Sequence, residues 1–346
     1  MRIVHLPFYE ENPYQRLLME AQRDLGHEVW PGGGGGNFLG IALREWKADI
    51  LHFHWLHPYL LRPSAMGSLL RATRFLIEVA LLKRCGAHIA WTIHNLANHE
   101  GAHPAIEHWF TSRFVGLADA CFVHSRAAAE SAAEAFGLPA SELHVIPHGN
   151  YLGAYPDQLG RNEARALLGL SGQAQVFLLL GRVEPYKGVF DLLEAFAGLP
   201  ESCHLVIAGQ TRDLGQARLL AERCAGLPRV HHFPGRVEDR DLQKFFHAAD
   251  VVVLPYKQIF TSGSLVLAMS FGKAVVLPKV PSLMEIVPDG GADWFDPQDP
   301  GSLAAAMTKS LGRDCREAGQ KNLASVREWD WKSIAQTTLK AMNPDA

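Results

Sequence analysis

The chain has 346 residues, more than one compact core usually holds and about right for two domains. Hydrophobic residues make up 48% and charged residues 20%, a balance typical of a globular protein and not of a disordered or fibrous one. The formal net charge is only −3, so we expect no nucleic-acid partner, and any anion-binding site must be local.

The five cysteines show no CxxC or metal-ligand spacing, which favours a reducing, cytoplasmic setting. The start MRIVHLPFYEENPYQ predicts a first strand and not a signal peptide, and no apolar run approaches the roughly 20 residues of a membrane span. Segment 60–84 is apolar and rich in Arg and Lys. It suits either a helix lying peripherally on the inner face of the cytoplasmic membrane or an ordinary core-facing helix.

Short apolar runs alternate with helical segments in both halves, which predicts βαβ units and two parallel sheets. In the first half, strands are expected at 2–6, 28–30, 50–54, 88–93, 120–124 and 143–146, with a helix at 14–25. In the second half they are expected at 176–180, 204–208, 230–233, 251–254 and 274–277, with helices at 189–197, 214–224, 240–248 and 263–271. Residues 147–156 form the expected linker, and the five-glycine run at 32–36 is either a surface loop or a phosphate cradle.

The octapeptide GRVEPYKG at 181–188 directly follows an apolar strand. The carboxyl end of a strand in an open parallel sheet borders the ligand crevice, so this loop lies where ligands bind. Arg182 offers a planar fork for phosphate oxygens and Lys187 a point charge, a pair that suits a diphosphate. A solvated turn with two surface cations is the alternative interpretation.

A second candidate anion site is Thr261-Ser262-Gly263-Ser264, between a strand and an apolar helix. Hydroxyls and a glycine at a helix start leave free backbone N–H groups at the positive end of the helix dipole. An ordinary N-cap would use the same residue types. Four polar or small residues in a row exceed what capping needs, which favours an anion site.

Five motifs follow one another in the second half: GR-x4-KG at 181–188, AG at 208–209, F-x-G-x-V at 233–237, AD-V-x-V-x-P at 249–255 and A-M-x-x-G-K-x-V-V at 268–276. The first half adds GHEV at 26–29, HFHW at 52–55, TIHN at 92–95 and AD-x4-HS at 118–125. Together they resemble the GT-B-fold glycosyltransferases of the large group 1 type, over nearly the whole chain.

The resemblance implies an α/β fold of GT-B architecture, with two Rossmann-like doubly wound domains facing a central cleft. It implies an acceptor-binding domain at 1–150 and a nucleotide-sugar-binding domain at 157–328. The remaining residues, 329–346, would form a C-terminal helix that crosses back to the first domain.

By the same resemblance, Arg182 and Lys187 bind the donor diphosphate and stabilise the charge on the leaving nucleotide. His54 corresponds to a histidine beside the transferred sugar. The other implied donor-binding residues are Gly235, Arg236 and Val237 near the base and Thr261, Ser262, Gly263 and Ser264 at the phosphates. No metal or other cofactor is expected, because the cations take the place of a metal.

One departure concerns the two glutamates of retaining relatives, whose positions correspond here to Ile259 and Leu267. A smaller bacterial set shares the TSGS helix and the linker sequence at 148–151, and is similar to GDP-mannose:glycolipid mannosyltransferases, which invert. We therefore expect an inverting glycosyltransferase of cell-envelope or exopolysaccharide synthesis that acts on a saccharide or lipid-linked saccharide. GDP-mannose is the favoured donor and a UDP-sugar the alternative. A retaining enzyme with substituted carboxylates and a non-catalytic nucleotide-sugar-binding partner of a polysaccharide assembly complex stay open.

Inversion requires a general base on the acceptor side. Glu100 is the first candidate, because it follows a strand end together with several imidazoles. His99, His94 and the pair Glu10 and Glu11 are the alternatives.

The block HFHWLH at 52–57 contains three histidines. Strand alternation puts His52 and His54 on one face, but no carboxylate or cysteine lies close in sequence to complete a metal site. We therefore expect no metal there, and we interpret Trp55 and Trp91 as core or cleft-wall residues.

Overall fold

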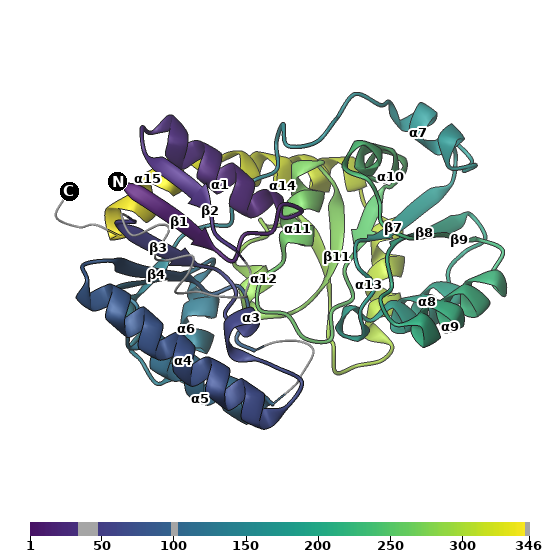
Figure 1. The fold of residues 1–346 in the computed structure, drawn as a ribbon. Helices are drawn as coiled ribbons and strands as arrows, with labels where there is room; N and C mark the ends of the chain where they lie inside the picture. Colours follow the sequence, from purple (N-terminus) through teal and green to yellow (C-terminus); the bar gives the residue numbers. More distant parts are fainter. Residues whose placement is uncertain (34–47, 98–102, 343–346) are drawn as a thin grey trace. The chain divides into compact units, whose positions relative to one another are not determined.

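The computed structural model describes residues 1–33, 48–97 and 103–342 (Figure 1). The chain divides into two compact units. Unit 1 comprises Met1–Gly149 with Trp329–Ala346, and unit 2 comprises Asn150–Glu328. Each unit has its own sheet and its own hydrophobic core.

The sheet of unit 1 is entirely parallel, in the order β2-β1-β3-β4-β5-β6. Its strands are β1 (Arg2–Leu6), β2 (Glu28–Pro31), β3 (Ile50–Phe53), β4 (His88–Thr92), β5 (Ala120–Val123) and β6 (Leu143–Val145). Because β2 lies on one side of β1 and β3 on the other, the strand order reverses between β1 and β3. Ligands of such sheets bind at this topological switch point, beyond the carboxyl ends of the strands.

The helices of unit 1 cover both faces of its sheet. They are α1 (Pro13–Asp24), α3 (His57–Leu60), α4 (Ala65–Arg84), α5 (Pro104–Val115), α6 (Arg126–Phe136) and α15 (Trp331–Met342). Helix α1 begins where the Asn12 side chain accepts the N–H of Tyr14, with Pro13 in the first turn. Its apolar face packs against α15, so the last helix completes the core of unit 1.

Unit 2 repeats this design with the order β12-β11-β10-β7-β8-β9, again all parallel. Its strands are β7 (Gln175–Leu180), β8 (Cys203–Gly209), β9 (Val230–Pro234), β10 (Val251–Val253), β11 (Ala274–Pro278) and β12 (Ala292–Phe295). Its helices of seven or more residues are α7 (Arg161–Leu167), α8 (Val189–Ala197), α9 (Leu214–Ala225), α10 (Leu242–Ala248), α11 (Gly263–Ser270), α13 (Ser302–Leu311) and α14 (Cys315–Arg327). The strand order reverses between β7 and β10, which makes these two strands the switch point.

An Ala-Asp sequence precedes β5 in unit 1 and β10 in unit 2, and its aspartate links that strand to a neighbour. Asp119 accepts the backbone N–H of Ile89 at 2.9 Å, and Asp250 accepts that of Val176 at 2.8 Å. Asp250 also accepts the buried Arg165 guanidinium at 2.7 Å. In both units the aspartate of the motif therefore stabilises strand pairing.

All eleven strands predicted from the sequence are present, with ends that differ by at most one residue. Strand β12 was not predicted, because its sequence ADWF includes an aspartate. The carboxylate of Asp293 is buried and is paired with Arg313 at 3.0 Å, which makes the strand compatible with the core. Residues 34–36 of the glycine run lie outside the described residues.

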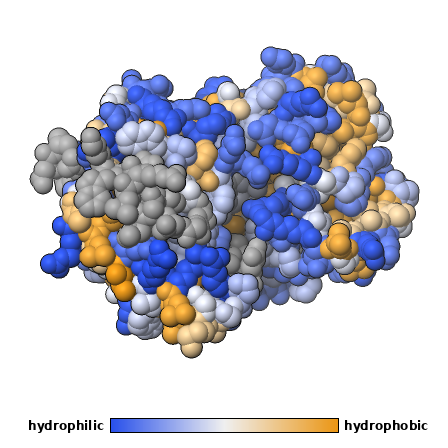
Figure 2. All heavy atoms as spheres, viewed as in Figure 1, coloured by the Kyte–Doolittle hydropathy of each residue, from blue (hydrophilic) through white to orange (hydrophobic). Residues whose placement is uncertain are grey.

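Helix α4 buries one stripe and exposes another. Ala72, Phe75 and Val79 are fully or almost fully buried on the side that faces the unit. On the opposite side, Met66, Leu70, Ile77 and Leu81 are between 52% and 66% exposed. Figure 2 shows apolar patches over this helix with hydrophilic surface between them. No helix among the described residues is both long and apolar enough to cross a membrane.

Candidate active site

The loops after β7 and β10 meet at the switch point of unit 2. The backbone N–H of Lys257, after β10, donates to the Tyr186 carbonyl of the β7 loop at 2.8 Å. A Cβ atom on Gly188 would lie only 2.2 Å from the Pro255 carbonyl oxygen, and Gly188 has a φ of +65°. Only glycine fits both the close approach and the backbone angle, which explains the last residue of the GRVEPYKG motif.

Two of the predicted phosphate-binding residues converge beside Gly181. A Cβ atom placed there would lie 3.3 Å from Lys187 Nζ and 3.9 Å from Ser264 Oγ. Burial, and then the positive charge of Arg182, lowers the pKa of Lys187 to about 8. Arg182 itself is exposed. The structure thus brings together one half-buried ammonium, one exposed guanidinium and the start of helix α11.

The hydroxyl groups at the start of α11 have different roles. Ser262 accepts the N–H of Leu265 at 3.1 Å as the N-cap, and its hydroxyl also hydrogen bonds the buried Tyr256 hydroxyl at 2.8 Å. Burial raises the pKa of Tyr256 to about 12, against the opposing effect of Ser262 and Ser264. Because Ser262 is committed to the cap, Ser264 is the serine whose side chain reaches towards Lys187. Thr261 is half-buried beside this cap.

The loop after β9 lies next in the row of carboxyl ends. Gly235 donates its N–H to the Gly209 carbonyl at 3.2 Å, and a Cβ atom on Gly209 would lie 1.8 Å from the Gly181 carbonyl oxygen. The predicted base-binding residues Arg236 and Val237 are respectively exposed and half-buried on this loop. The loops after β7, β8 and β9 therefore form one continuous edge.

The carboxyl end of the unit 1 sheet carries a histidine within three residues of the end of five strands. We call them the histidine row: His5, His54, His94, His124 and His148. Consecutive ring centroids in this order lie 5.1, 5.4, 5.4 and 5.2 Å apart, close to the ~4.8 Å spacing of strands. All five side chains are buried, and the Tyr14 ring packs against four of them.

Hydrogen bonds fix the tautomers at one end of the histidine row. His5 donates Nε2–H to the Gln22 side-chain carbonyl at 2.8 Å, so its Nδ1 accepts from His54 Nε2–H at 2.8 Å. His54 Nδ1 in turn accepts from His94 Nε2–H at 3.2 Å. This chain leaves Nδ1 of His94 with a lone pair that can accept a hydrogen bond.

The histidine row is neutral at physiological pH. Burial lowers the pKa of His5 and His124 to about 4 and that of His148 to about 3. Burial, followed by the neighbouring histidines, holds the pKa of His54 and His94 well below the ordinary value. Neutral imidazoles both donate and accept hydrogen bonds.

The two tryptophans singled out from the sequence, Trp55 and Trp91, lie in different environments. Trp91 is buried in the core, with its ring against Phe114 and Phe136. Trp55 is half-buried and stacks on His94 with centroids 4.6 Å apart. A small hollow of about 30 Å³ lies beside His54 and Trp55.

The structure describes some of the predicted general bases and not others. Glu100 and His99 lie outside the described residues, so their role stays a prediction. Glu10 and Glu11 are exposed in the loop after β1. His94 lies in the histidine row.

The sequence interpretation passed over several residues of these two edges. They are Tyr186 and Tyr256 in unit 2 and His5, Tyr14, His124 and His148 in unit 1. The sequence did contain a signal for all of them except Tyr14. Each of the other five lies within about six residues of the end of a predicted strand. Comparing all strand ends of one sheet would have found the histidine row.

Two parallel, doubly wound sheets form a GT-B-type fold, and similar solved structures share it. Sucrose-phosphate synthase from Thermosynechococcus elongatus has a TM-score of 0.77 at 18% identity, over 97% of each chain. HepE from Anabaena, solved in complex with UDP and glucose, has a TM-score of 0.76 at 16% identity, over 99% of this chain and 100% of the other.

Two family models match, glycosyl transferases group 1 over residues 160–322 and glycosyltransferase family 4 over residues 35–150. The GDP-mannose:glycolipid 4-beta-D-mannosyltransferase of Xanthomonas campestris pv. campestris is 28% identical over 98% of this chain and 91% of its own length. A D-inositol 3-phosphate glycosyltransferase of Xylanimonas cellulosilytica is 29% identical over 65% of this chain and 57% of its own. The two models together cover most of the chain, which is a glycosyltransferase, as its motifs indicated.

Proposed function

We propose that this glycosyltransferase moves a hexose from a nucleotide sugar, with GDP-mannose as the favoured donor, to a lipid-linked saccharide of the cell envelope. The observation that carries the donor assignment is the convergence of Lys187 and Ser264 beside Gly181 in unit 2. An ammonium, a guanidinium and a helix N-terminus form the usual elements of a diphosphate site. GDP-mannose is favoured over UDP-sugars because of the relative from Xanthomonas.

In this proposal Lys187 and Arg182 neutralise the negative charge that grows on the diphosphate as the glycosidic bond breaks. The N–H groups at the start of α11 and the Ser264 hydroxyl donate hydrogen bonds to the phosphate oxygens and orient them. No metal takes part at the diphosphate. Gly235, Arg236 and Val237 line the side of the nucleoside.

We propose inversion of the anomeric centre. Ile259 and Leu267 occupy the positions of the two glutamates of retaining relatives, and neither side chain can act as a nucleophile or contact a ribose hydroxyl through a charge. Direct displacement then requires a base on the acceptor hydroxyl. Glu100 is the first candidate for this base and His99 the second, while the neutral imidazole of His94, whose Nε2 is held by His54, orients a sugar hydroxyl.

We further propose that helix α4 rests on the membrane that carries the lipid-linked acceptor. The exposed stripe of Met66, Leu70, Ile77 and Leu81 is the apolar surface that such contact requires. Arginines and lysines flank it along the same segment: Arg62, Arg71, Arg74, Lys83 and Arg84. An apolar stripe bordered by cations fits the anionic inner face of a cytoplasmic membrane.

The donor site is tested by titrating the purified protein with GDP, UDP and ADP in a calorimeter. Arg182→Ala and Lys187→Ala should each weaken binding of the preferred nucleotide by about 10- to 100-fold, as the loss of a charge-assisted contact does. Lys321→Ala removes a cation from α14 of the same unit and should change nothing. Equal nucleotide affinity in all four proteins contradicts the proposal.

The reaction is tested with GDP-mannose and lipid extracts as acceptors, and the product anomer is assigned by NMR. A β-mannoside from the α-linked donor supports inversion, while an α-mannoside identifies a retaining enzyme. A protein that binds GDP-mannose tightly yet transfers nothing to any acceptor would be a non-catalytic partner of an assembly complex.

Membrane contact is tested by sedimentation with vesicles of phosphatidylglycerol and phosphatidylcholine. The double change Leu70→Ser and Ile77→Ser should release most of the bound protein. Leu214→Ser, at a 76% exposed position of unit 2, is the matched control. If the double change does not affect vesicle binding, α4 is not the part of the protein that contacts the membrane.

A further inference from the structure

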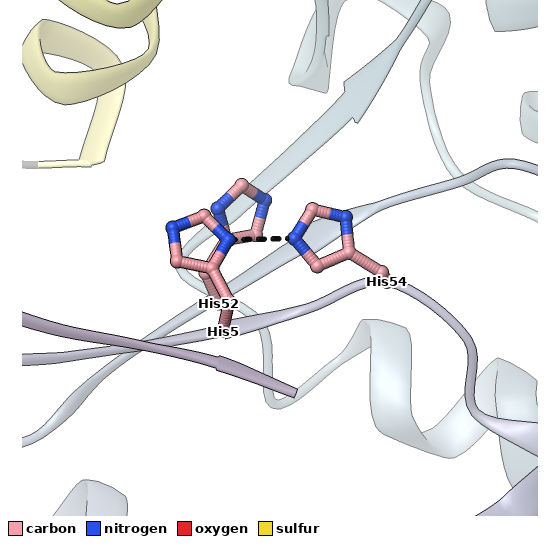
Figure 3. A group of neighbouring side chains, drawn as sticks. All are labelled: His5, His52 and His54. Carbon is pink, nitrogen blue, oxygen red and sulfur yellow. Dashed lines mark hydrogen bonds between the residues drawn. The ribbon is translucent and has the colours of Figure 1, made fainter. Parts of the chain in front are cut away.

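Three histidines of unit 1 lie close enough to share one ion. His5 comes from β1, and His52 and His54 come from β3 and the residue after it (Figure 3). One nitrogen from each ring lies within 4.8 Å of the others, and all three side chains are buried. Two nitrogens bound to one tetrahedral zinc ion are ~3.4 Å apart, so a pair separated by 4.8 Å must approach by ~1.4 Å, shared between two side chains.

In each of the three rings, the nitrogen that would not bind the metal already has a hydrogen-bond partner outside the group. His5 Nε2 bonds Gln22, His52 Nε2 bonds the Thr92 hydroxyl at 2.8 Å, and His54 Nδ1 bonds His94. Histidines that bind metals almost always have such an outer partner, which fixes the ring and its tautomer. The nitrogens left for a metal are His5 Nδ1, His52 Nδ1 and His54 Nε2.

His52 supplies the second observation. Its Nδ1 has no hydrogen-bond partner among the described residues, although the side chain is completely buried. A buried polar atom without a partner is unfavourable and needs an explanation. A metal ion bound to Nδ1 would provide that missing partner.

We propose that His5, His52 and His54 form a binding site for a late first-row divalent cation such as Zn²⁺. Three neutral imidazoles and no carboxylate favour zinc, cobalt or nickel over magnesium and calcium, which prefer oxygen ligands. A zinc ion held by three protein ligands takes a water molecule as its fourth. The site is separate from the diphosphate site and does not depend on the proposed transfer reaction.

Metal binding has a consequence for the histidine row. In the hydrogen-bonded form His54 donates Nε2–H to His5, and a metal takes the place of this shared proton. The proton then resides on His54 Nδ1 and is donated to His94 Nε2, so His94 carries its own proton on Nδ1. No proton leaves the protein, and His94 Nδ1 changes from an acceptor to a donor.

The test uses the full-length protein, stripped with a chelator, loaded with one equivalent of Zn²⁺ and desalted. We expect about one zinc per chain by elemental analysis and a raised Tm, since a ligand of the native state stabilises it. Titration with Co²⁺ should give the visible absorption of a four- or five-coordinate nitrogen site. Less than about a tenth of an equivalent of retained zinc, with no cobalt spectrum, overturns the proposal.

Matched variants remove one ligand nitrogen while keeping each outer hydrogen bond. His52→Gln and His5→Gln keep a polar group at the position of Nε2, and His54→Asn keeps one at the position of Nδ1. Each should weaken zinc binding by more than about 100-fold, measured by competition with a fluorescent chelator. Thr92→Val, which removes an outer partner, should weaken it by about 10- to 100-fold.

One control variant separates this site from adventitious binding. His204 and His231 form another imidazole pair, with nitrogens 2.9 Å apart on β8 and β9, but no third histidine group is described there. His231→Gln should leave zinc affinity unchanged. If His52→Gln binds zinc as tightly as the wild type, the ion lies elsewhere, for example at the exposed Cys85 thiol, and the proposal is wrong.

Discussion

The carboxyl edges of the two sheets share one topology and carry opposite chemistry. In unit 2 the edge presents Arg182, Lys187 and the start of α11, a positive surface that is partly exposed. In unit 1 the same edge presents the histidine row, which is buried and neutral. Strand order decides where a ligand can bind, and the residues at the strand ends decide which ligand it is.

The difference in charge between the two edges has a physical reason. Burial lowers the pKa of Lys187 to about 8, so this side chain still carries its charge at neutral pH, as the proposed diphosphate site requires. Five imidazoles about 5 Å apart cannot share a buried space as cations, so they stay neutral. The two edges should therefore respond to pH in different ranges.

The largest expected effect is acid destabilisation of unit 1. Burial lowers the pKa of His124 to about 4 and of His148 to about 3, whereas both titrate near 6.5 in the unfolded chain. Below pH 6.5 the unfolded state binds more protons, so stability is full above that pH and is lost as the pH falls towards 4. Each residue should contribute about 2 kcal/mol of lost stability at pH 5.

Urea denaturation of the chelator-treated protein at pH 7.5 and 5.0 measures this loss. His124→Asn, which keeps a donor for the Ile146 carbonyl, should reduce the difference by about 2 kcal/mol. His144→Asn, at an exposed position, should not change it. A pH-independent stability would show that unit 1 does not hold these imidazoles neutral.

The second prediction concerns the packing beneath the histidine row. A Cβ atom on Gly149 would lie 2.4 Å from the Trp331 ring, within unit 1. Gly149→Ala should lower the free energy of unfolding by about 1–3 kcal/mol, as overpacking of a filled site does. Gly116→Ala, where a Cβ atom meets nothing closer than 3.5 Å, is the control for urea denaturation. Equal stability of both variants would mean that Trp331 moves aside freely.

The third prediction tests the charge of unit 2. Lys187 loses its proton in the free protein as the pH rises through about 8, and a diphosphate binds the charged form better. Nucleotide affinity should fall by about tenfold between pH 7 and 9, because one pKa unit corresponds to one factor of ten. Lys187→Arg stays charged and should abolish the decline in calorimetric titrations. If the nucleotide affinity of the wild type does not change with pH, Lys187 does not bind the diphosphate.

The smallest expected effect concerns the hydroxyl network at the start of α11. Tyr256→Phe removes the buried hydrogen bond to Ser262 and should lower the stability of unit 2 by about 1 kcal/mol. Thermal unfolding measures this change. Nucleotide affinity should fall only slightly, since Ser262 still caps Leu265. An affinity loss as large as that of Lys187→Ala would place Tyr256 itself against the nucleotide.

Local sequence was enough to predict most of the fold. The period of the apolar runs identified eleven strands, because parallel strands that are buried on both faces need continuous apolar sequence. The GRVEPYKG and TSGS motifs could be predicted as neighbours, since both follow strands of one sheet. Strand β12 was missed because its aspartate is acceptable only with Arg313 beside it, a partner twenty residues away.

The sequence by itself determined the two-sheet fold and the glycosyltransferase class, and it singled out Arg182, Lys187 and Ser264, whose role at a diphosphate stays a prediction. Those features depend on short stretches whose residues are neighbours in the chain. Only the tertiary structure decided that Ser262 serves the helix cap, and that His5, His52 and His54 share one buried space. Their proximity is set by the pairing of β1 with β3, across more than forty residues, and no local pattern encodes that distance.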